Sequence, residues 1–393
     1  MTRALRQIPV ARPVLDEREV EAVRRVVLSG WVTQGPEVAA FEKAFAEKVG
    51  APHACAVSNC TTALHLALKA VGVGMDDEVI TVSHSFIATA NAIRYCGGIP
   101  VLVDIEQNGF NIDVALIEPA ITSRTKAILC VHQLGMPCDL VRIVEIGRRH
   151  GIPVIEDAAC AIGSEILCGD TWEPIGRPHG DIACFSFHPR KVITTGDGGM
   201  LTTGNPEYDA KFKLWRQHSM SVSDAVRHGS STVIQESYPE LGYNYRMTDL
   251  QAALGRVQLE RLPEIIARRR ELAQLYGAAM ASVPGIVVPH EPAWARSNWQ
   301  SYCIGLPIAI NQREVMQTML DHGIATRRGV MNIHLEPAYR RCRSYVTGSD
   351  LERSVAAQSH SIILPLSGHM ADEDVGVVAS TLDMALRQSA EAA

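Results

Sequence analysis

Lys191 is the residue whose setting most strongly suggests covalent chemistry. It lies in the segment DIACFSFHPRKVITTGDGGML, where an apolar run that we predict to be a buried strand leads into a polar turn and then three glycines. A neutral lysine amine can form a Schiff base with an aldehyde, and we expect partial burial and nearby positive charge to lower its pKa. Most lysines that follow a strand are solvated loop residues, so partners are needed to decide between these interpretations.

Asp157 is a second candidate, at the end of the apolar run in IPVIEDAACAIG. Two carboxylates, Glu156 and Asp157, follow the predicted strand and precede small residues that we expect to begin a helix. Ligands of open α/β sheets bind at the carboxyl ends of the strands, and an acid there can keep a pyridine nitrogen protonated. The alternative is a helix N-cap. With Lys191 in the same sequence, the role as pyridine partner is favoured.

Small polar residues 58–62 form a third candidate site, in VSNCTTALHLAL. They lie between a predicted strand and a strong helix, where free backbone N–H groups and the helix dipole can bind a phosphate. Simple capping by Asn59 or Thr61 is the alternative, and this segment alone favours it. Phe86, in SFIATANAI, is predicted to open the next helix at the same sheet edge, where its ring can stack on a flat cofactor or belong to the core.

The elements that position these residues follow a regular alternation from Ala51 to about Gly204. Short apolar runs such as EVITVS and IPVLVDI alternate with helical patterns, which is typical of βαβ units around a parallel sheet. Further strands are predicted at Lys126–His132, Ile152–Glu156 and Asp181–Phe185, with a helix over Leu140–His150. The pattern predicts an α/β fold with a mostly parallel central sheet.

A smaller domain is predicted after this sheet. The pattern becomes helical from Thr248 to about Val283, and Pro263 is expected to break or kink that helix. Strands near Ile286–Val288 and Ser301–Pro307, a helix near Gln312–His322 and a final helix from Asp372 follow. We therefore predict a large domain over residues 1–260 and a small α+β domain over residues 261–393.

Composition excludes several classes of protein. The formal net charge is −6 and no block of like charge suits a phosphate backbone, so we expect no nucleic-acid partner. Ten cysteines occur without a C-x-x-C pair or zinc-like spacing, so we predict free thiols and no metal. No signal peptide or membrane span is recognisable, and a cytoplasmic location is expected.

Six segments occur in the order of the motifs of the DegT-type (sugar) aminotransferases, which have fold type I of the pyridoxal 5′-phosphate (PLP) enzymes. The sequence resembles that family from roughly Ser29 to the final helix, and the lysine-containing segment is its most specific match. The matching segments are SGWVTQGPEVAAFE, VSNCTTALHLAL, SFIATANAI, IPVIEDAACAIGS, CFSFHPRKVITTGDGGML and LGYNYRMTDLQAALGRVQL.

The resemblance implies a role for each matching residue. Lys191 corresponds to the lysine that binds the cofactor's aldehyde and moves a proton between the α-carbon of the donor and C4′ of the cofactor. Asp157 corresponds to the pyridine-nitrogen partner and Phe86 to the stacking aromatic. Thr61 and Ser186 correspond to phosphate ligands.

Asn244, in GYNYRM, corresponds to an asparagine that in the family reaches the phosphate of the neighbouring subunit. The resemblance therefore implies a homodimer with shared active sites.

Two cysteines depart from the family pattern. Cys160 stands where His or Gln is usual near the cofactor's phenolic oxygen, and a thiol is a weak donor. Cys60 stands where Gly is usual beside the phosphate, so a positive φ there would be strained. Both changes put the local cofactor geometry in doubt, and neither affects Lys191.

The acceptor side is predicted from four further residues. Arg327 and His334, with Arg328 and Tyr339 in the same stretch GIATRRGVMNIHLEPAY, correspond to a family segment that approaches the substrate. Arginines there can bind a carboxylate or a nucleotide diphosphate, or form surface ion pairs in a solvated turn. His188, beside Lys191 in the motif, and Trp31 are further substrate candidates. For Trp31 an interface or core position is equally compatible.

We therefore expect a homodimeric PLP-dependent aminotransferase that moves an amino group from an amino acid, with glutamate favoured, to a nucleotide-linked keto-sugar. A keto-cyclitol acceptor with glutamine as donor is the alternative within the family. A non-catalytic regulator that kept the fold is the alternative outside it. The family's dehydratases carry histidine in place of the lysine, so Lys191 argues against that branch.

Overall fold

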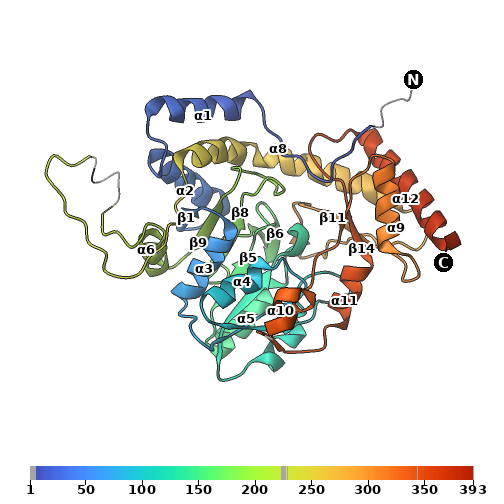
Figure 1. Ribbon diagram of the computed structural model, residues 1–393, viewed down its shortest axis with the longest axis horizontal. Coiled ribbons are helices and arrows are strands. Elements are labelled where there is room, and N and C mark those ends of the chain that lie inside the picture. The colour runs from blue at the N-terminus through green and yellow to red at the C-terminus, as the bar shows by residue number, and fades with distance from the viewer. Residues whose placement is uncertain (1–5, 223–226, 228, 343, 393) are drawn as a thin grey trace.

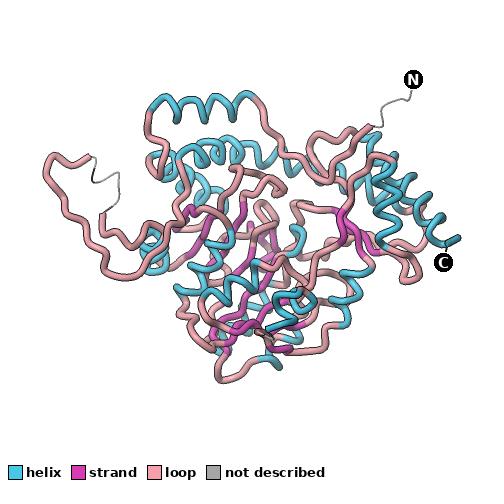
Figure 2. The backbone as a smooth tube through the Cα atoms, viewed as in Figure 1, coloured by secondary structure: helices cyan, strands magenta, loops and turns pink. Residues whose placement is uncertain are grey.

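The structure is a computed structural model that describes residues 6–222, 227, 229–342 and 344–392. One region surrounds a large central sheet, and a second, smaller region contains both the last helix and a three-stranded sheet (Figure 1). Helices enclose the strands on both sides (Figure 2). Among the described residues, no helix is both long and apolar enough to span a membrane.

The central sheet has eight strands and is mostly parallel, as the alternation predicts. Strand β9 is antiparallel to both of its neighbours, β1 and β8, and the other pairs are parallel. In spatial order the strands are β1 (His53–Val57), β9 (Gly199–Thr203), β8 (Ile182–Ser186), β5 (Val154–Asp157), β4 (Thr125–Val131), β2 (Glu78–Val82), β3 (Ile99–Val103) and β13 (Val346–Thr347).

Helices cover both faces of this sheet, and successive residues of each strand point to opposite faces. In β8, Ile182 and Cys184 pack in the cluster that contains α3, α4 and α6, whereas Ala183 and Phe185 pack in the cluster that contains α2, α5 and α8. The first face carries α3 (Cys60–Ala70), α4 (Ala88–Tyr95) and α6 (Pro206–Trp215), and the second carries α2 (Pro36–Val49), α5 (Leu140–His150) and α8 (Asp249–Met280).

Helix α8 is continuous through Pro263, so of the break or kink expected at this proline the break is wrong, and the kink stays a prediction. Proline inside a helix removes one hydrogen bond and costs about 3 kcal/mol. Apolar residues on both sides of it, including Leu262 and Ile265, are buried in the core beneath the sheet. This packing holds the helix together across the missing bond. Helix α1 (Glu17–Ser29) also packs along it.

The smaller region has a core of its own, formed by β11 (Tyr302–Gly305), β14 (Ser361–Leu364), α9 (Gln312–Asp321) and α12 (Asp372–Ala392). The exposed strand β12 (Arg327–Arg328) pairs with β14. The predicted strand at Ser301–Pro307 and the last two predicted helices are therefore present. The end of α8 contributes Leu272 and Tyr276 to this core. The boundary expected at residue 260 falls inside α8 and stays a prediction.

The structure differs from the expected pattern after Asp157. The helix expected there is absent, and residues 158–164 form turns. Several elements that were not expected are also present. A hairpin of β6 (Glu165–Cys168) and β7 (Thr171–Pro174) follows and pairs with β10 (Ala295–Arg296). The remaining elements are η1 (Val114–Leu116), η2 (Glu118–Ala120), η3 (Gln133–Gly135), η4 (Ile333–Leu335), α10 (Pro337–Cys342) and α11 (Glu352–Ser359).

Candidate active site

The site lies at the carboxyl ends of β5 and β8, which are neighbours in the central sheet. Asp157 ends β5 and Ser186 ends β8, and the alternation along each strand directs both side chains to the face covered by α3 and α4. Both residues are buried. Strand order therefore brings together two candidate residues that are 29 positions apart.

Lys191 lies in the turn after β8, and its Nζ is 3.0 Å from the Sγ of Cys160. Burial lowers the pKa of the Lys191 ammonium, but the Cys160 sulfur and the Asp157 carboxylate outweigh it, so the pKa is raised. The expected depression by nearby positive charge is therefore wrong, because the groups that face the amine are acidic. The sequence did not predict this contact, since Cys160 was expected near the phenolic oxygen of the cofactor.

Asp157 is held by two hydrogen bonds. Its Oδ2 accepts from the Thr89 hydroxyl at 2.9 Å, and its Oδ1 accepts from the Ala159 N–H at 3.2 Å. Burial raises the pKa of Asp157, and the Thr89 hydroxyl and Lys191 oppose that rise. The Ala159 bond closes a turn, and no helix begins there, so the N-cap alternative does not describe this carboxylate.

The start of α3 offers two free donors. Asn59 caps the helix by accepting from the Thr62 N–H, and the N–H groups of Cys60 and Thr61 find no acceptor within the described part of the chain. Free N–H groups at a helix start are an anion-binding arrangement. A Cβ at Gly199 would lie 2.5 Å from the Asn59 carbonyl oxygen, so glycine is required where β9 passes this turn.

The two cysteines cause less disturbance than their departure from the family pattern suggested. Cys60 is the first residue of α3 and is not among the described non-glycine residues with positive φ, so the strain considered for it does not arise. Its buried thiol points away from solvent, 3.7 Å from the Cys184 carbonyl oxygen. Cys160 is partly buried and faces Lys191.

Phe86 lies just before α4, which begins at Ala88 rather than at the phenylalanine. Its side chain is 63% exposed, so it is not a core residue in this structure. A large aromatic ring exposed after β2, one strand beyond β4 in the same sheet, is available to a ligand.

The small region contributes His334 to the same edge. Its Nδ1 lies 2.6 Å from the hydroxyl of Ser83, the residue after β2, and burial lowers the pKa of this histidine. Arg327 and Arg328 are exposed on β12, and Arg328 pairs with Glu336 at 3.4 Å. Tyr339 is buried and donates to the Asn91 side chain, a packing role between α10 and α4.

The three remaining predicted residues, His188, Trp31 and Asn244, lie in different local settings. His188 is partly buried two residues before Arg190, whose N–H it accepts, and burial lowers its pKa. The indole of Trp31 donates to the Gln34 carbonyl at 3.2 Å. Asn244 is exposed near the end of the long segment between α6 and α8, and the described residues of this segment extend away from the body (Figure 1).

Two residues of the site have no individual signal in the sequence. Thr89 supports Asp157, and Asn298 is buried and donates to the carbonyls of Cys160 and Ile162 at 2.7 and 2.8 Å. Thr89 lies in SFIATANAI, so the motif contained it without indicating its partner. One cavity, of about 450 Å³, is lined by residues of α1, α2 and α8, and another, of about 590 Å³, is lined by His334 and residues 347–360. Neither is lined by Lys191.

The fold and this site define a fold type I aminotransferase, and the sequence places the chain in a family. The profile of the DegT/DnrJ/EryC1/StrS aminotransferase family matches residues 13–383, and the chain belongs to that family. It is thus a PLP-dependent aminotransferase. GDP-perosamine synthase of Caulobacter vibrioides is 38% identical over 386 residues, covering 97% of this chain and 99% of that protein.

Solved structures agree with this assignment. PseC of Helicobacter pylori, an aminotransferase involved in the biosynthesis of pseudoaminic acid, has a TM-score of 0.90 and 27% identity, with 98% of this chain and all of that chain covered. DesI, solved in the presence of its TDP-sugar product, has a TM-score of 0.86 and 29% identity, and covers 98% of this chain and 95% of its own.

Proposed function

We propose that this protein moves an amino group from glutamate to a nucleotide-linked keto-sugar, with PLP bound through Lys191. The observation that carries the proposal is the convergence of Lys191, Asp157 and Ser186 at one edge and one face of the central sheet. The relatives support the substrate class: one is a GDP-perosamine synthase, and DesI has a TDP-sugar as product.

The chemistry of the residues at this site fits PLP. The unpaired N–H groups of Cys60 and Thr61 and the Ser186 hydroxyl supply donors for a phosphate. The buried carboxylate of Asp157 suits a protonated ring nitrogen, and exposed Phe86 suits a flat ring. Lys191 supplies the amine for an aldehyde. The phosphate, the ring nitrogen and the aldehyde of the cofactor thereby each have a partner of the matching kind.

PLP, when bound, supplies an electron sink for the carbanion that transamination requires. The chain's residues do the rest. Lys191 would hold the cofactor through its Nζ, and the same amine would take up the proton of the donor's α-carbon. Asp157, whose carboxylate Thr89 and Ala159 hold in place, would keep the ring nitrogen protonated. The N–H groups of α3 and the Ser186 hydroxyl would hold the phosphate.

We also propose that two copies share their active sites. The described residues between α6 and α8 extend from the body, and among them Val233 and Leu241 are 93% and 90% exposed. Asn244 is exposed near the end of this segment. A partner subunit that buries these side chains would bring its phosphate site close to Asn244 of this chain.

An absorbance spectrum tests the cofactor proposal. The purified protein with added PLP should show the band of lysine-bound cofactor, and Lys191→Ala should abolish it. Lys211→Ala is the matched control, because Lys211 is exposed on α6, and should leave the band unchanged. A protein that stays colourless with added cofactor would overturn the proposal and favour a non-catalytic role.

A complementation experiment tests the shared sites. Lys191→Ala and Asn244→Ala proteins are each expected to be weakly active, whereas an unfolded and reassembled equal mixture should regain about a quarter of wild-type activity, since half the dimers hold one intact site. A mixture no more active than its components would show that Asn244 serves its own subunit or none.

Substrate screening tests the donor and acceptor. Glutamate should convert the bound cofactor to its pyridoxamine form faster than glutamine does, and keto-sugar nucleotides should return it. Preference for glutamine together with a keto-cyclitol would replace our choice of substrates, while leaving the aminotransferase chemistry intact.

A further inference from the structure

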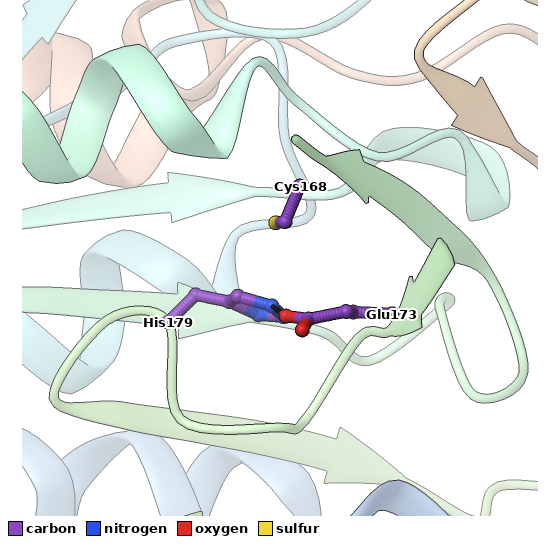
Figure 3. A group of neighbouring side chains, drawn as sticks. All are labelled: Cys168, Glu173 and His179. Carbon is purple, nitrogen blue, oxygen red and sulfur yellow. Dashed lines mark hydrogen bonds and ion pairs between the residues drawn. The ribbon is translucent and has the colours of Figure 1, made fainter. Parts of the chain in front are cut away.

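Three potential metal ligands lie together away from the sheet edge that carries Lys191. Cys168 ends β6, Glu173 is on β7, and His179 follows in the segment that leads to β8. One ligand atom from each lies within 4.8 Å of the other two. Figure 3 shows the Glu173 carboxylate and the His179 ring end to end, with Cys168 beside them.

The hairpin register explains how these residues meet. Ile166 is paired with Glu173 and Cys168 with Thr171, so Cys168 and Glu173 lie on one face of the hairpin, diagonal to each other. The chain then turns back and places the Nε2 of His179 2.7 Å from the Oε2 of Glu173. The cysteine spacing predicted no zinc site, since here the ligands come from a hairpin and the segment that folds back onto it.

The imidazole is available as a ligand through its second nitrogen as well. The Nδ1 of His179 is buried and has no hydrogen-bond partner within the described residues. Tetrahedral ligands of zinc lie roughly 3.3–3.6 Å apart, and a thiolate, an imidazole and a carboxylate are all zinc ligands. The three atoms therefore need only small side-chain rotations to converge.

We propose that Cys168, Glu173 and His179 bind a zinc ion, with water as the fourth ligand. Zinc suits this set better than magnesium or calcium, which prefer oxygen ligands alone. Binding releases the thiol proton to solvent, and the thiolate then bonds the metal. The site is independent of transamination, because none of its three residues contacts the cofactor candidates.

One charge opposes the metal and must move aside. Arg177 pairs with the Oε1 of Glu173 at 3.3 Å, and it is half-exposed, so it can turn to solvent when the cation binds. Burial, and then the Glu173 carboxylate, raise the pKa of the Cys168 thiol, so the metal competes with a proton for the sulfur. Both effects predict moderate rather than very tight affinity at neutral pH.

The expected consequence is local stability. The hairpin also pairs with β10, and the guanidinium of Arg296 lies 3.8 Å above the Trp172 ring. A metal would join both strands of the hairpin to the segment that enters β8. We therefore expect zinc to raise the unfolding temperature without changing the catalytic rate.

A second surface cluster provides a control within the same chain. His150 lies 2.7 Å from Glu118, and Arg149 pairs with that glutamate at 3.1 Å. The trio of histidine, glutamate and arginine is thus repeated there without a cysteine. If an ion pair were enough to bind zinc, this cluster would bind it too.

The experiment titrates Zn²⁺ and Co²⁺ into the tag-free holoenzyme. We expect one equivalent of Zn²⁺ to bind, and Co²⁺ to give the visible bands of a tetrahedral thiolate site. Cys168→Ser and His179→Gln should each weaken Zn²⁺ binding at least about tenfold. The matched variants Cys96→Ser, at another partly buried thiol, and His150→Gln should bind as the wild type does.

Protection of Cys168 provides a measurement that does not depend on variants. Zn²⁺ should slow its alkylation, read by mass spectrometry, and leave alkylation of Cys96 unchanged. Absence of binding at millimolar Zn²⁺, equal affinity in the Cys168→Ser protein, or unprotected Cys168 would each overturn the site. None of these results bears on the absorbance test of Lys191.

Discussion

Glu156 and Asp157 are consecutive acids at the end of β5, and they lie on opposite faces of the central sheet. Glu156 accepts from His132 Nε2 at 3.0 Å and from the Gly180 N–H at 3.3 Å. His132 Nδ1 accepts the Cys138 N–H, so the ring donates through Nε2 to the carboxylate. Asp157 accepts from Thr89 and Ala159 and is one of the groups that face Lys191.

The difference separates a structural carboxylate from one available to a ligand. The partners of Glu156 join β4, β5 and the segment before β8 into a closed hydrogen-bonded network. The partners of Asp157 fix the carboxylate at the edge where the free N–H groups of α3 also lie. Burial is nearly equal for the two acids, so the identity of the neighbours, and not the degree of burial, distinguishes them.

The largest expected effect tests the ligand side of this comparison. Asp157→Asn should lower kcat/KM roughly 10³-fold, because a neutral amide no longer keeps the ring nitrogen protonated. The change is nearly isosteric, so far-ultraviolet circular dichroism should match the wild type. Steady-state transamination measures the loss, and the absorbance maximum of the bound cofactor reports the changed ring protonation.

Activity within tenfold of the wild type in Asp157→Asn would assign the pyridine-partner role elsewhere. Glu156→Gln, as the matched control, should keep kcat/KM within a few-fold when it is measured on folded protein at low temperature.

The sequence predicts much of this region because its signals are local. The βαβ alternation predicted the strands that carry Asp157 and Ser186, and parallel order places their carboxyl ends together. A two-residue period also implies that Glu156 and Asp157 face opposite ways. It does not show which face is which, since that depends on where α3, α4 and α5 pack.

Long-range packing accounts for what was not predicted. Thr89 meets Asp157 across 68 positions, and Asn298 meets Cys160 across 138, and neither pair leaves a spacing signal. The pKa of Lys191 was expected to fall because positive charge was assumed to lie nearby. The sequence does not show which groups surround the amine. Pro263 was expected to break or kink α8, and a break was considered because the sequence shows the local cost of proline but not the burial of the flanking residues.

The second prediction tests the structural side. Glu156→Gln leaves one carbonyl oxygen for two donors and removes a charge-assisted bond, which should cost about 1.5–3 kcal/mol of unfolding free energy. Urea denaturation of the cofactor-free protein measures it. An unchanged midpoint would mean that the His132 network contributes no net stability.

The third prediction concerns the support of Asp157. Thr89→Val removes the hydroxyl that donates to Asp157 and contacts Ser85 Oγ at 2.8 Å, so kcat should fall about 3–10-fold. Thr81→Val is the matched control, since that buried hydroxyl donates to the Leu129 carbonyl. Equal loss of activity in both variants would reduce Thr89 to a packing residue.

The smallest effect concerns the pH dependence that Asp157 gives to stability. Burial raises the pKa of Asp157 in the folded cofactor-free protein, so its contribution to stability is full below the pKa of an unfolded aspartate and declines as pH rises through the raised value. Cofactor-free Asp157→Asn lacks this decline. It should melt on the order of 2 °C above the wild type at neutral pH, and the gap should narrow as pH falls.

Glu156→Gln should instead melt below the wild type at neutral pH. A gap for Asp157→Asn that widens on acidification would show that the Asp157 carboxylate stabilises the fold, and it would remove the distinction between the two acids.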